Sequence, residues 1–474
     1  MKIKDTLLSI YFRCPIWIQN LLCTVEGYRI YKQRFGKEFK KIYASLLLTE
    51  NYTKEQIRKY KEEHLSEILH YAYNHCPFYR RKFDAAGVSP DDFKVLEDLR
   101  KFPVLTKDEV RENIKDMISD EYKIKDLIPY HTSGSTGKSL NFYWTKENLQ
   151  YYWAAVTRGR HRLGVMLKDR QLDFTGKLVV PLSQNKPPYW RYNKALNQFL
   201  INQQHITAEK VPSIVSFINK SNIVFFSGYP SIVYTLATHI NAQGLKITNP
   251  PHFFFSGAEK VYGYQKIAIE KAFPGIKIME TYSFSEEAGS MHRYECGHYH
   301  EDFEFGHFEL ADPSKMTDRL LVTGLQNFGM PFIRYEIGDV GTIAADDHFC
   351  KLQSAAFEDI EGRNEDYIIT AEGQRLTRLG YVFNGTSYFE AQIIQRKVGS
   401  IVIRAVPNKN SDIKKDEELI RDEVYKHFSK TLKVYFEYVD EIPRTQAGKF
   451  KFLISEISSE EKANFAAKLA GESK

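Results

Sequence analysis

Residues 131–140, HTSGSTGKSL, combine two glycines, several short hydroxyl side chains and Lys138. Glycine allows backbone N–H groups to turn towards an anion, so this composition suits a loop that holds phosphate. A flexible polar turn at the surface has the same composition. The stretch does not match the P-loop pattern, because Thr132 stands where that pattern requires a glycine, five positions before Gly137. Taken alone, it favours a phosphate loop and leaves the polar turn open.

The middle of the chain alternates apolar strands with helices, and this alternation must position any such site. Strands are expected within residues 222–230, 252–260 and 276–287, and helices within 231–244 and 262–273. Strands that alternate with helices of this length predict a parallel sheet with crossover helices.

Polar segments stand at the carboxyl ends of these three expected strands. They read SGYPS, SGAEK and TYSFSEE; all carry hydroxyl groups, and two carry an acid, Glu259 or Glu286. In open parallel sheets, ligands gather at the carboxyl ends of the strands. The sequence therefore predicts a site in that crevice.

The pattern changes beyond residue 362. An expected strand at 400–410, a charged amphipathic helix at 414–432 and a strand at 433–443 predict a compact α+β unit. We therefore predict an α/β protein with a large N-terminal domain, residues 1–362, and a small hinged domain, residues 363–474. The segment EGRNEDYI would join them.

Composition excludes some classes of function. The chain has 474 residues and a net charge of +6, from 66 basic and 60 acidic residues, which is no nucleic-acid signature. Five cysteines without a CxxC pair argue against a disulfide framework and favour a cytoplasmic location.

The N-terminal segment raises a separate question. Its apolar run is interrupted by Arg13 and Pro15, so we expect no spanning helix. Two alternatives stay open: the segment packs on the main domain, or it lies on the inner face of a membrane with Trp17 and its basic neighbours.

Six motifs follow one another between residues 132 and 449: TSGSTGK, SGAEK, TYSFSEE, RYEIGDV, EGRNED and PRTQAGK. Their order resembles the core motifs of the adenylate-forming superfamily, which includes acyl- and aryl-CoA ligases, luciferase and nonribosomal adenylation domains. Within it, the chain is most similar to the phenylacetate–CoA ligase-like proteins of the CapK or coenzyme F390 synthetase-like branch, associated with capsular polysaccharide genes. The resemblance covers nearly the whole chain.

The resemblance implies contacts with ATP. The loop that would hold its β- and γ-phosphates comprises Ser133, Gly134, Ser135, Thr136, Gly137 and Lys138. The strand end that would flank adenine comprises Gly257, Ala258 and Glu259. Tyr282 would stack on adenine, and Ser285 would contact phosphate.

The same resemblance implies the catalytic groups. Glu286 would hold Mg²⁺, a cation that prefers carboxylate and phosphate oxygens. Asp339 would accept both ribose hydroxyls, and Arg363 would make a second ribose and phosphate contact. Lys449 stands where this family has its catalytic lysine, which stabilises charge as the acid attacks the α-phosphorus.

The expected function is therefore ATP- and Mg²⁺-dependent activation of a small carboxylic acid as its acyl-adenylate, with release of pyrophosphate. The stretch after the hinge, IITAEGQRLTRLGYVFNG, departs from the glycine-rich turn of many thioester-forming relatives. Adenylation is thus better supported than transfer to CoA. The acceptor stays open between CoA, a carrier-protein thiol, and an amine or hydroxyl of a glycan precursor.

Two alternatives remain. One is an adenylyltransferase of the coenzyme F390 synthetase type. The other is a docking protein that binds a nucleotide without catalysis, against which the intact set Lys138, Glu286, Asp339 and Lys449 argues.

A zinc site is a further candidate. Cys296, His298 and His300 are close in the sequence, and Cys350 follows. Some relatives bind zinc in these regions, and tetrahedral sets of Cys and His are usual for structural zinc. Otherwise the cysteines are small buried hydrophobic residues.

Overall fold

The structure is a computed structural model that describes most of the chain. The described residues are 2–131, 140–175, 178–345, 350–361, 368–371, 375–376, 382–383, 385–408, 411–427, 431–444, 450–458 and 461. Of the helices in these ranges, none combines the length and the apolar character that crossing a membrane requires.

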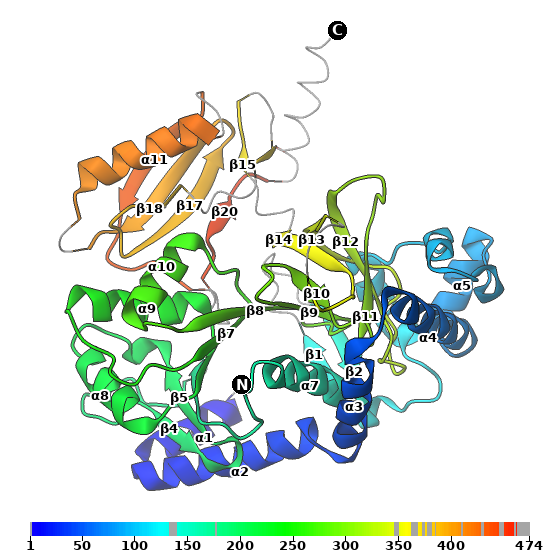
Figure 1. The fold of residues 1–474 in the computed structure, drawn as a ribbon, viewed down its shortest axis with the longest axis horizontal. Helices are drawn as coiled ribbons and strands as arrows, with labels where there is room; N and C mark the ends of the chain where they lie inside the picture. The colour runs from blue at the N-terminus through cyan, green and yellow to red at the C-terminus, as the bar shows by residue number, and fades with distance from the viewer. Residues whose placement is uncertain are drawn as a thin grey trace.

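Helices fill the first part of the chain, along the lower and outer edges of the molecule (Figure 1). They are α1 (Lys2–Arg13), α2 (Ile16–Arg34), α3 (Lys37–Leu48), α4 (Lys54–His75), α5 (Pro77–Ala86) and α6 (Lys107–Met117). Thr53 caps α4, because its hydroxyl accepts a hydrogen bond from the Gln56 N–H. Pro77 occupies the first turn of α5, where a missing N–H is tolerated, and Gly87 ends that helix in the left-handed conformation.

In the described part of the chain, twelve strands form one large sheet in the order β11-β12-β13-β14-β10-β9-β8-β7-β6-β3-β5-β4. The bounds are β3 (Gln171–Thr175), β4 (Arg191–Asn193), β5 (Gln198–Asn202), β6 (Phe225–Gly228), β7 (Phe253–Gly257), β8 (Lys277–Ser283), β9 (Ser290–Arg293), β10 (Tyr299–Glu301), β11 (Gly306–Leu310), β12 (Thr317–Gly324), β13 (Tyr335–Ile343) and β14 (Ala356–Glu361). The run from β5 through β3, β6 and β7 to β8 is parallel. The expected parallel strands are therefore confirmed.

The crossover helices of the parallel half are α8 (Val211–Ser221), α9 (Pro230–Ala242) and α10 (Gly263–Ala272). They cover one face of the sheet, where Phe226 and Phe254 are buried among residues of all three helices. Phe225 and Phe255 alternate with these residues and point to the other face, because successive strand side chains alternate. Apolar residues on both faces explain why β6 and β7 are almost continuous hydrophobic runs.

Helix α7 (Lys146–His161) runs between the large sheet and the N-terminal helices α2 and α3 (Figure 1). Thr145 caps it by accepting a hydrogen bond from the Asn148 N–H. The strands β1 (Ile128–His131) and β2 (Asn141–Trp144) pair antiparallel immediately before it, with His131 opposite Asn141. This ribbon therefore flanks the predicted phosphate loop on both sides.

The C-terminal unit has a sheet and a core of its own. Its described strands are β17 (Glu390–Lys397), β18 (Ser400–Val406), β19 (Lys433–Tyr438) and β20 (Leu453–Ser455), in the order β19-β18-β17-β20, and α11 (Ile413–His427) accompanies them. The expected helix and the two expected strands, β18 and β19, are present. Strands β17 and β20 were not expected from the sequence. The strands β15 (Ile368–Ile369) and β16 (Arg375–Leu376) form a separate short pair.

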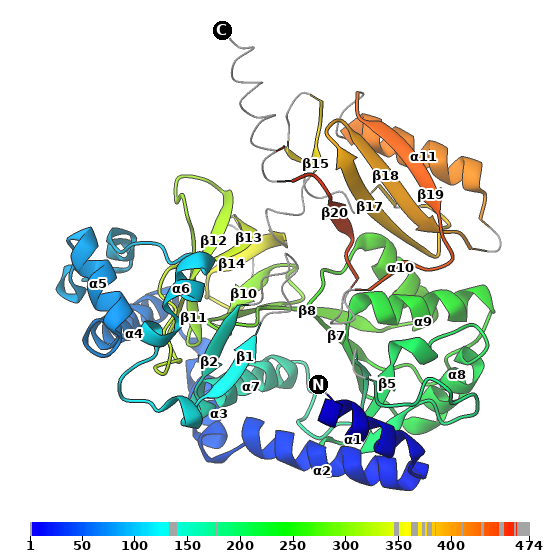
Figure 2. The same cartoon turned by 180° about the vertical axis from the view of Figure 1, so that it is seen from behind.

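The C-terminal unit lies over α9 and α10 in both views (Figure 1 and Figure 2). Tyr262, just before α10, stacks on Phe452 with ring centroids 4.2 Å apart. The Tyr234 hydroxyl of α9 donates a hydrogen bond to the Tyr388 carbonyl, at 3.3 Å. These contacts hold the unit beside the carboxyl ends of the parallel strands.

Candidate active site

The loop after β6 and the loop after β7 meet at the carboxyl edge of the sheet. The Ser231 N–H donates a hydrogen bond to Oε2 of Glu259, at 3.1 Å. Gly228 ends β6 with φ of +133°, and a Cβ there would lie 2.4 Å from the Phe174 carbonyl oxygen. Only glycine therefore allows β6 to approach β3 this closely before the chain turns into the site.

Glu259 also contacts the C-terminal unit. Its Oε1 accepts a hydrogen bond from the Phe450 N–H, at 2.8 Å, and burial raises the pKa of this carboxyl. Phe450 directly follows the PRTQAGK segment in the sequence. The structure thus brings the main chain beside that segment to the SGAEK strand end.

Tyr282 and Asp339 meet although they come from different halves of the sheet. Tyr282 belongs to β8 and Asp339 to β13, and the tyrosine hydroxyl donates a hydrogen bond to Oδ2 of Asp339, at 2.7 Å. Burial, with a smaller contribution from the Asp339 charge, raises the pKa of Tyr282 well above its ordinary value. The phenol therefore stays protonated and can donate to the carboxylate.

Glu286 is a buried carboxylate beside this pair, with only 4% of its surface exposed. The Tyr335 hydroxyl, at the start of β13, donates a hydrogen bond to Oε1 of Glu286. Ser285 is exposed and precedes it, and Glu287 follows with φ of +44°, in the left-handed region. The sharp turn at Glu287 sends Glu286 inward and leaves Ser285 at the surface.

The structure thus places Gly257, Ala258, Glu259, Tyr282, Ser285, Glu286 and Asp339 at or beside the carboxyl edge of the parallel strands. The other expected residues lie outside the described residues: Ser133, Gly134, Ser135, Thr136, Gly137, Lys138, Arg363 and Lys449. The sequence analysis missed Tyr335, although RYEIGDV contains it, because the motif alone does not show that this side chain reaches Glu286.

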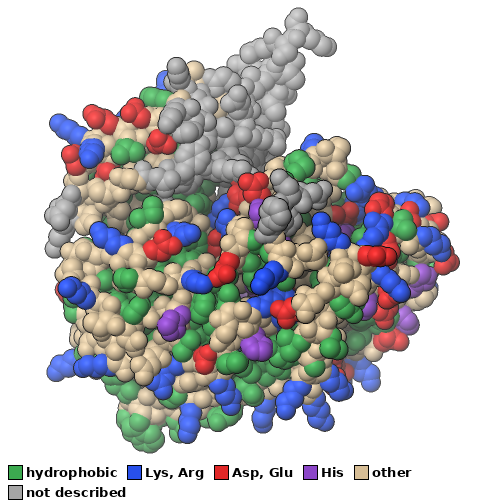
Figure 3. Space-filling view, viewed as in Figure 1, with side chains coloured by type: hydrophobic (Ala, Val, Ile, Leu, Met, Phe, Trp, Pro, Cys, Tyr) green, Lys and Arg blue, Asp and Glu red, His purple; other side chains and the backbone are tan. Residues whose placement is uncertain are grey.

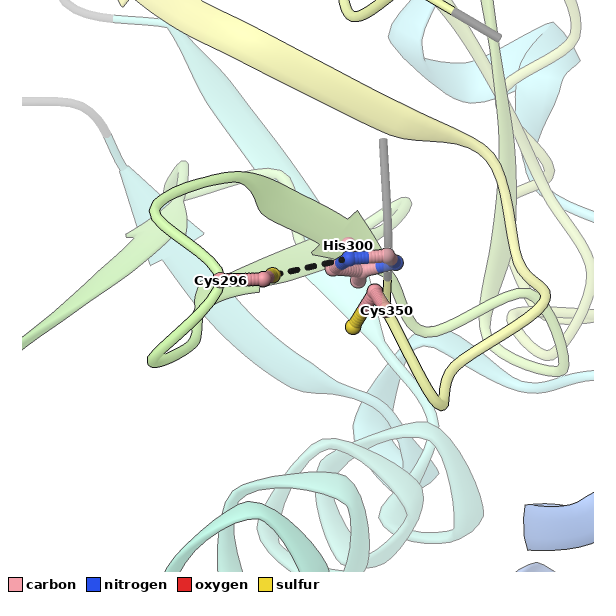
Figure 4. Close-up of side chains that lie close together, drawn as sticks. All are labelled: Cys296, His300 and Cys350. Atoms are coloured by element: carbon pink, nitrogen blue, oxygen red, sulfur yellow. Dashed lines mark hydrogen bonds between the residues drawn. The ribbon is translucent and has the colours of Figure 1, made fainter. Parts of the chain in front are cut away.

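The expected metal ligands come together in part. Ligand atoms of Cys296, His300 and Cys350 all lie within 4.8 Å of one another (Figure 4). Sγ of Cys296 is 3.4 Å from Nε2 of His300, across the turn between β9 and β10. His298 is not part of this described set. Thiolates with an imidazole are the donors that zinc prefers, so the three residues suit that metal.

Comparison with known proteins first defines the class. The fold is that of an acyl-CoA ligase: the solved structure of 2-hydroxyisobutyryl-CoA ligase with 2-HIB-AMP matches with a TM-score of 0.66 at 18% identity, covering 89% of this chain and 94% of the other. Residues 368–456 match the family model of the CapK C-terminal domain.

Two curated relatives then narrow the resemblance. The chain is 26% identical over 455 residues to Protein CapK of Staphylococcus aureus, covering 94% of this chain and 99% of the relative. It is also 26% identical over 354 residues to phenylacetate-coenzyme A ligase of Thermus thermophilus, covering 68% and 73%. The chain is therefore a homologue of CapK and of the phenylacetate–CoA ligases, which confirms the predicted resemblance.

Proposed function

We propose that this protein is an AMP-forming ligase that converts a small carboxylic acid and ATP into an acyl-adenylate and pyrophosphate. The observation that carries the proposal is the convergence of Tyr282, Glu286 and Asp339, since these residues come from two separate motifs and meet at one strand edge. A phenol beside a carboxylate suits an adenosine, with a ring to stack on and an acceptor for ribose hydroxyls.

In this mechanism, the phosphates lie between the loop of Ser133–Lys138 and Ser285. Asp339 accepts the ribose hydroxyls, Tyr282 stacks on adenine beside Gly257–Glu259, and Arg363 adds a ribose and phosphate contact. Lys449 stabilises the charge that develops while the carboxylate attacks the α-phosphorus and pyrophosphate leaves.

Glu286 fits Mg²⁺, because it is a buried carboxylate and Tyr335 donates to only one of its two oxygens. We assign Oε2 to the cation. Magnesium bound there would supply neutralisation of the phosphate charge.

We further propose that residues 363–474 form a mobile lid that turns at Glu365–Asp366. The hydrogen bond from the Phe450 N–H to Glu259 supports contact between this lid and the strand end. Rotation of the lid would withdraw Lys449 and admit the acceptor, which we take to be a thiol, amine or hydroxyl. Relatives of this fold are solved with an acyl-AMP and, in another conformation, with CoA. The CapK resemblance supports a place in capsule or surface polysaccharide biosynthesis.

The test is ATP–pyrophosphate exchange across a panel of aryl, amino and small hydroxy acids. We expect exchange that depends on one acid, with a loss of about a hundredfold or more in Lys449→Ala. Lys451→Ala, a nearby lysine without an assigned role, is the matched control and should keep activity. Full activity of Lys449→Ala would contradict the mechanism. Tight ATP binding without exchange would favour the docking protein, and transfer of AMP to a cofactor would favour the F390 synthetase type.

We propose structural zinc at Cys296, His300 and Cys350, where it would tie the β9–β10 turn to the segment before β14. Elemental analysis of the purified protein should find about one zinc per chain, and Cys350→Ser should lose it. A metal-free parent protein with an unchanged melting temperature after chelation would contradict this site.

We also propose peripheral contact with an anionic membrane through α2. Trp17, Leu21, Val25 and Tyr28 recur at helical spacing, and each is more than half exposed. Figure 3 shows hydrophobic side chains with Lys and Arg along the lower edge, where α2 runs. Apolar and aromatic residues with basic neighbours suit the surface of an anionic bilayer.

Sedimentation with phosphatidylglycerol vesicles tests this contact. The parent protein should sediment, and a double variant, Trp17→Ser with Leu21→Ser, should not. Ile267→Ser removes an equally exposed apolar residue from α10 and is the matched control. Equal sedimentation of all three proteins would contradict the proposal.

A further inference from the structure

A cavity of about 60 Å³ lies between α2, α7 and the face of the sheet that α8–α10 do not cover. We name it the arginine cavity and define it by Arg34, Trp153, Arg160, Asp173, Gln198 and Ser227. It has room for about four water-sized groups. The lining is mixed, because Phe35, Val165, Met166, Leu167 and Leu196 share it with the polar side chains.

Two arginines face this cavity without a hydrogen-bonded anion. Among the described residues, neither the Arg34 nor the Arg160 guanidinium forms an ion pair or a hydrogen bond. The Arg34 guanidinium lies 3.7 Å from the centroid of the Trp153 ring. That of Arg160 lies 5.0 and 4.9 Å from the rings of Phe225 and Phe255. The aromatic faces orient both groups but use none of their N–H donors, of which each guanidinium has five.

One acid lines the cavity beside the two arginines. Asp173 accepts a hydrogen bond from Nε2 of Gln198, at 2.7 Å, and burial raises the pKa of its carboxyl, while the charges of Arg34 and Arg160 act to lower it. Burial lowers the pKa of Arg160 to about 10, which still leaves it charged at neutral pH. Two arginines against one acid give the cavity an excess of positive charge.

The cavity lies next to the candidate active site. Tyr152 precedes Trp153 on α7, and its hydroxyl is 3.4 Å from Oγ of Ser283, at the carboxyl end of β8. Eight residues separate Tyr152 from Arg160, a rise of about 12 Å along the helix. One face of α7 thus extends from the TYSFSEE segment to the arginines.

The strands of the large sheet also place the arginine cavity beside the candidate active site. Asp173 of β3 and Ser227 of β6 are register partners, so their side chains share one face of the sheet. Ser227 also begins the SGYPS segment at the strand end. A ligand in the strand-end crevice can therefore extend into the arginine cavity.

We propose that the arginine cavity binds a second anionic group, a carboxylate or a phosphate, at the far end of the acid that this protein activates. This inference rests on the proposed function and names its substrate class. A guanidinium offers paired donors that match carboxylate and phosphate oxygens. An acid with an apolar far end would displace water from both cations without replacing its hydrogen bonds, which is unfavourable.

Arg34 is held in place by the junction of α2 and α3. A Cβ at Gly36 would lie 2.7 Å from Nε2 of Gln150, and Oε1 of that glutamine accepts a hydrogen bond from the Phe39 N–H. The absence of a side chain at Gly36 thus lets the end of α2 approach α7. Gly36 and Gln150 thus shape the junction that directly follows Arg34.

The experiment compares matched acids in ATP–pyrophosphate exchange. Glutarate, adipate and pimelate are each paired with their monoamide, and phosphoglycolate and phosphoglycerate with glycolate and glycerate. We expect the parent protein to prefer at least one acid with an anionic far end over the matched acid with a neutral far end. The expected preference is about 10- to 100-fold in kcat/KM. The carboxylate and phosphate arms identify which anion is bound.

Arg160→Gln and Arg34→Gln should each remove most of this preference. Arg162→Gln is the matched control, because it removes the same charge from the end of α7 at a residue that pairs with Glu50 outside the cavity. It should keep the preference. A melting temperature of Arg160→Gln at or above that of the parent shows that a loss of preference is not a loss of fold.

Two outcomes would overturn the inference and are distinguishable from failure of the proposed function. The first is exchange that is equal for acids with an anionic and with a neutral far end, and unaffected by Arg160→Gln. This outcome overturns the anion site while adenylation stands.

If no acid supports exchange, the proposed function fails. Calorimetric titration of each acid with an anionic far end onto the protein then decides whether the anion site exists. Binding that is lost in Arg160→Gln supports the anion site, and equal or absent binding in both proteins overturns it.

Discussion

Arg158 and Arg160 lie two residues apart on α7, and they differ in the number of their hydrogen-bonded partners. Arg158 is buried and paired: its Nη1 lies 2.5 Å from Oε1 of Glu304, and its Nη2 lies 3.0 Å from Oδ1 of Asp302. Nη1 also donates to the Leu46 carbonyl, at 3.1 Å. The Arg160 guanidinium lies over the Phe225 and Phe255 rings and forms no hydrogen bond or ion pair among the described residues. One helix therefore carries a charge that is hydrogen-bonded to two acids and a charge that is hydrogen-bonded to none.

The difference separates two uses of a cation on one helix, Arg158 being buried and Arg160 partly buried. The network around Arg158 joins α7 to the segment between β10 and β11 and to the end of α3, so it stabilises the fold. A cation without a partner contributes little to stability, and under our proposal a ligand supplies the partner of Arg160. The predictions below test whether the number of hydrogen-bonded partners determines if a charged side chain stabilises the fold or serves ligand binding.

The largest effect is expected for Arg158→Gln. It leaves Glu304 buried without its cation and leaves Asp302 with His292 as its remaining ion-pair partner, so the free energy of unfolding should fall by about 3–5 kcal/mol. Urea unfolding measures it. Adding Asp302→Asn and Glu304→Gln to this variant should restore part of the loss. A loss no larger than that of Arg162→Gln would show that partner number does not matter.

Tyr335→Phe comes next. Glu286 has a single neutral partner in the described structure, the Tyr335 hydroxyl, and the variant removes it. Loss of a group that orients a metal ligand typically lowers metal affinity by about tenfold or more. We expect the Mg²⁺ concentration for half-maximal exchange to rise by about that factor, with kcat at saturating Mg²⁺ much less affected. An unchanged Mg²⁺ dependence would show that Tyr335 does not position Glu286.

For Arg162→Gln we expect a loss in the free energy of unfolding between those of Arg158→Gln and Arg160→Met. Nε of Arg162 lies 2.5 Å from Oε1 of Glu50, but both side chains are only partly buried. Solvent screens such a pair, so the loss should be about 1 kcal/mol or less. A loss as large as that of Arg158→Gln would show that burial matters less than we argue.

The smallest effect is expected for Arg160→Met. Removal of a partly buried cation without a hydrogen-bond partner gains a small free energy, and loss of the cation–π contacts with Phe225 and Phe255 opposes this gain by a similar amount. The free energy of unfolding should therefore stay within about 1 kcal/mol of the parent. A loss of several kcal/mol would mean that Arg160 serves the fold, and the comparison with Arg158 would fail.

Hydrophobic periodicity in the sequence predicted the parallel strands and crossover helices in the middle of the chain. The alternation over residues 222–287 predicted the parallel order of β6, β7 and β8, because buried strands and amphipathic helices have distinct periods. Glu259 and Glu286 were expected at the strand ends for the same reason. Strands β17 and β20 were not expected, although β17 pairs with β20 and β18 in the C-terminal sheet.

The arginine cavity could not be predicted in this way. Arg34 and Arg160 are far apart in the sequence, and each ends or nearly ends a helix where a basic residue is usual. Their lack of partners depends on which side chains the tertiary fold brings near. Likewise, the closeness of Cys296, His298 and His300 in the sequence predicted one cluster, but among the described residues His298 is not part of it.

Gly36 has a consequence for how this protein can change. It does not line the cavity, yet a Cβ there would push aside the Gln150 amide, which accepts a hydrogen bond from the Phe39 N–H beside the end of α2 that carries Arg34. If the proposed anion site is correct, a single substitution at Gly36 would change the acids that are accepted without touching a residue that binds them. In a lineage under selection for a new substrate, this hidden position offers a route by which specificity drifts while every catalytic motif stays intact.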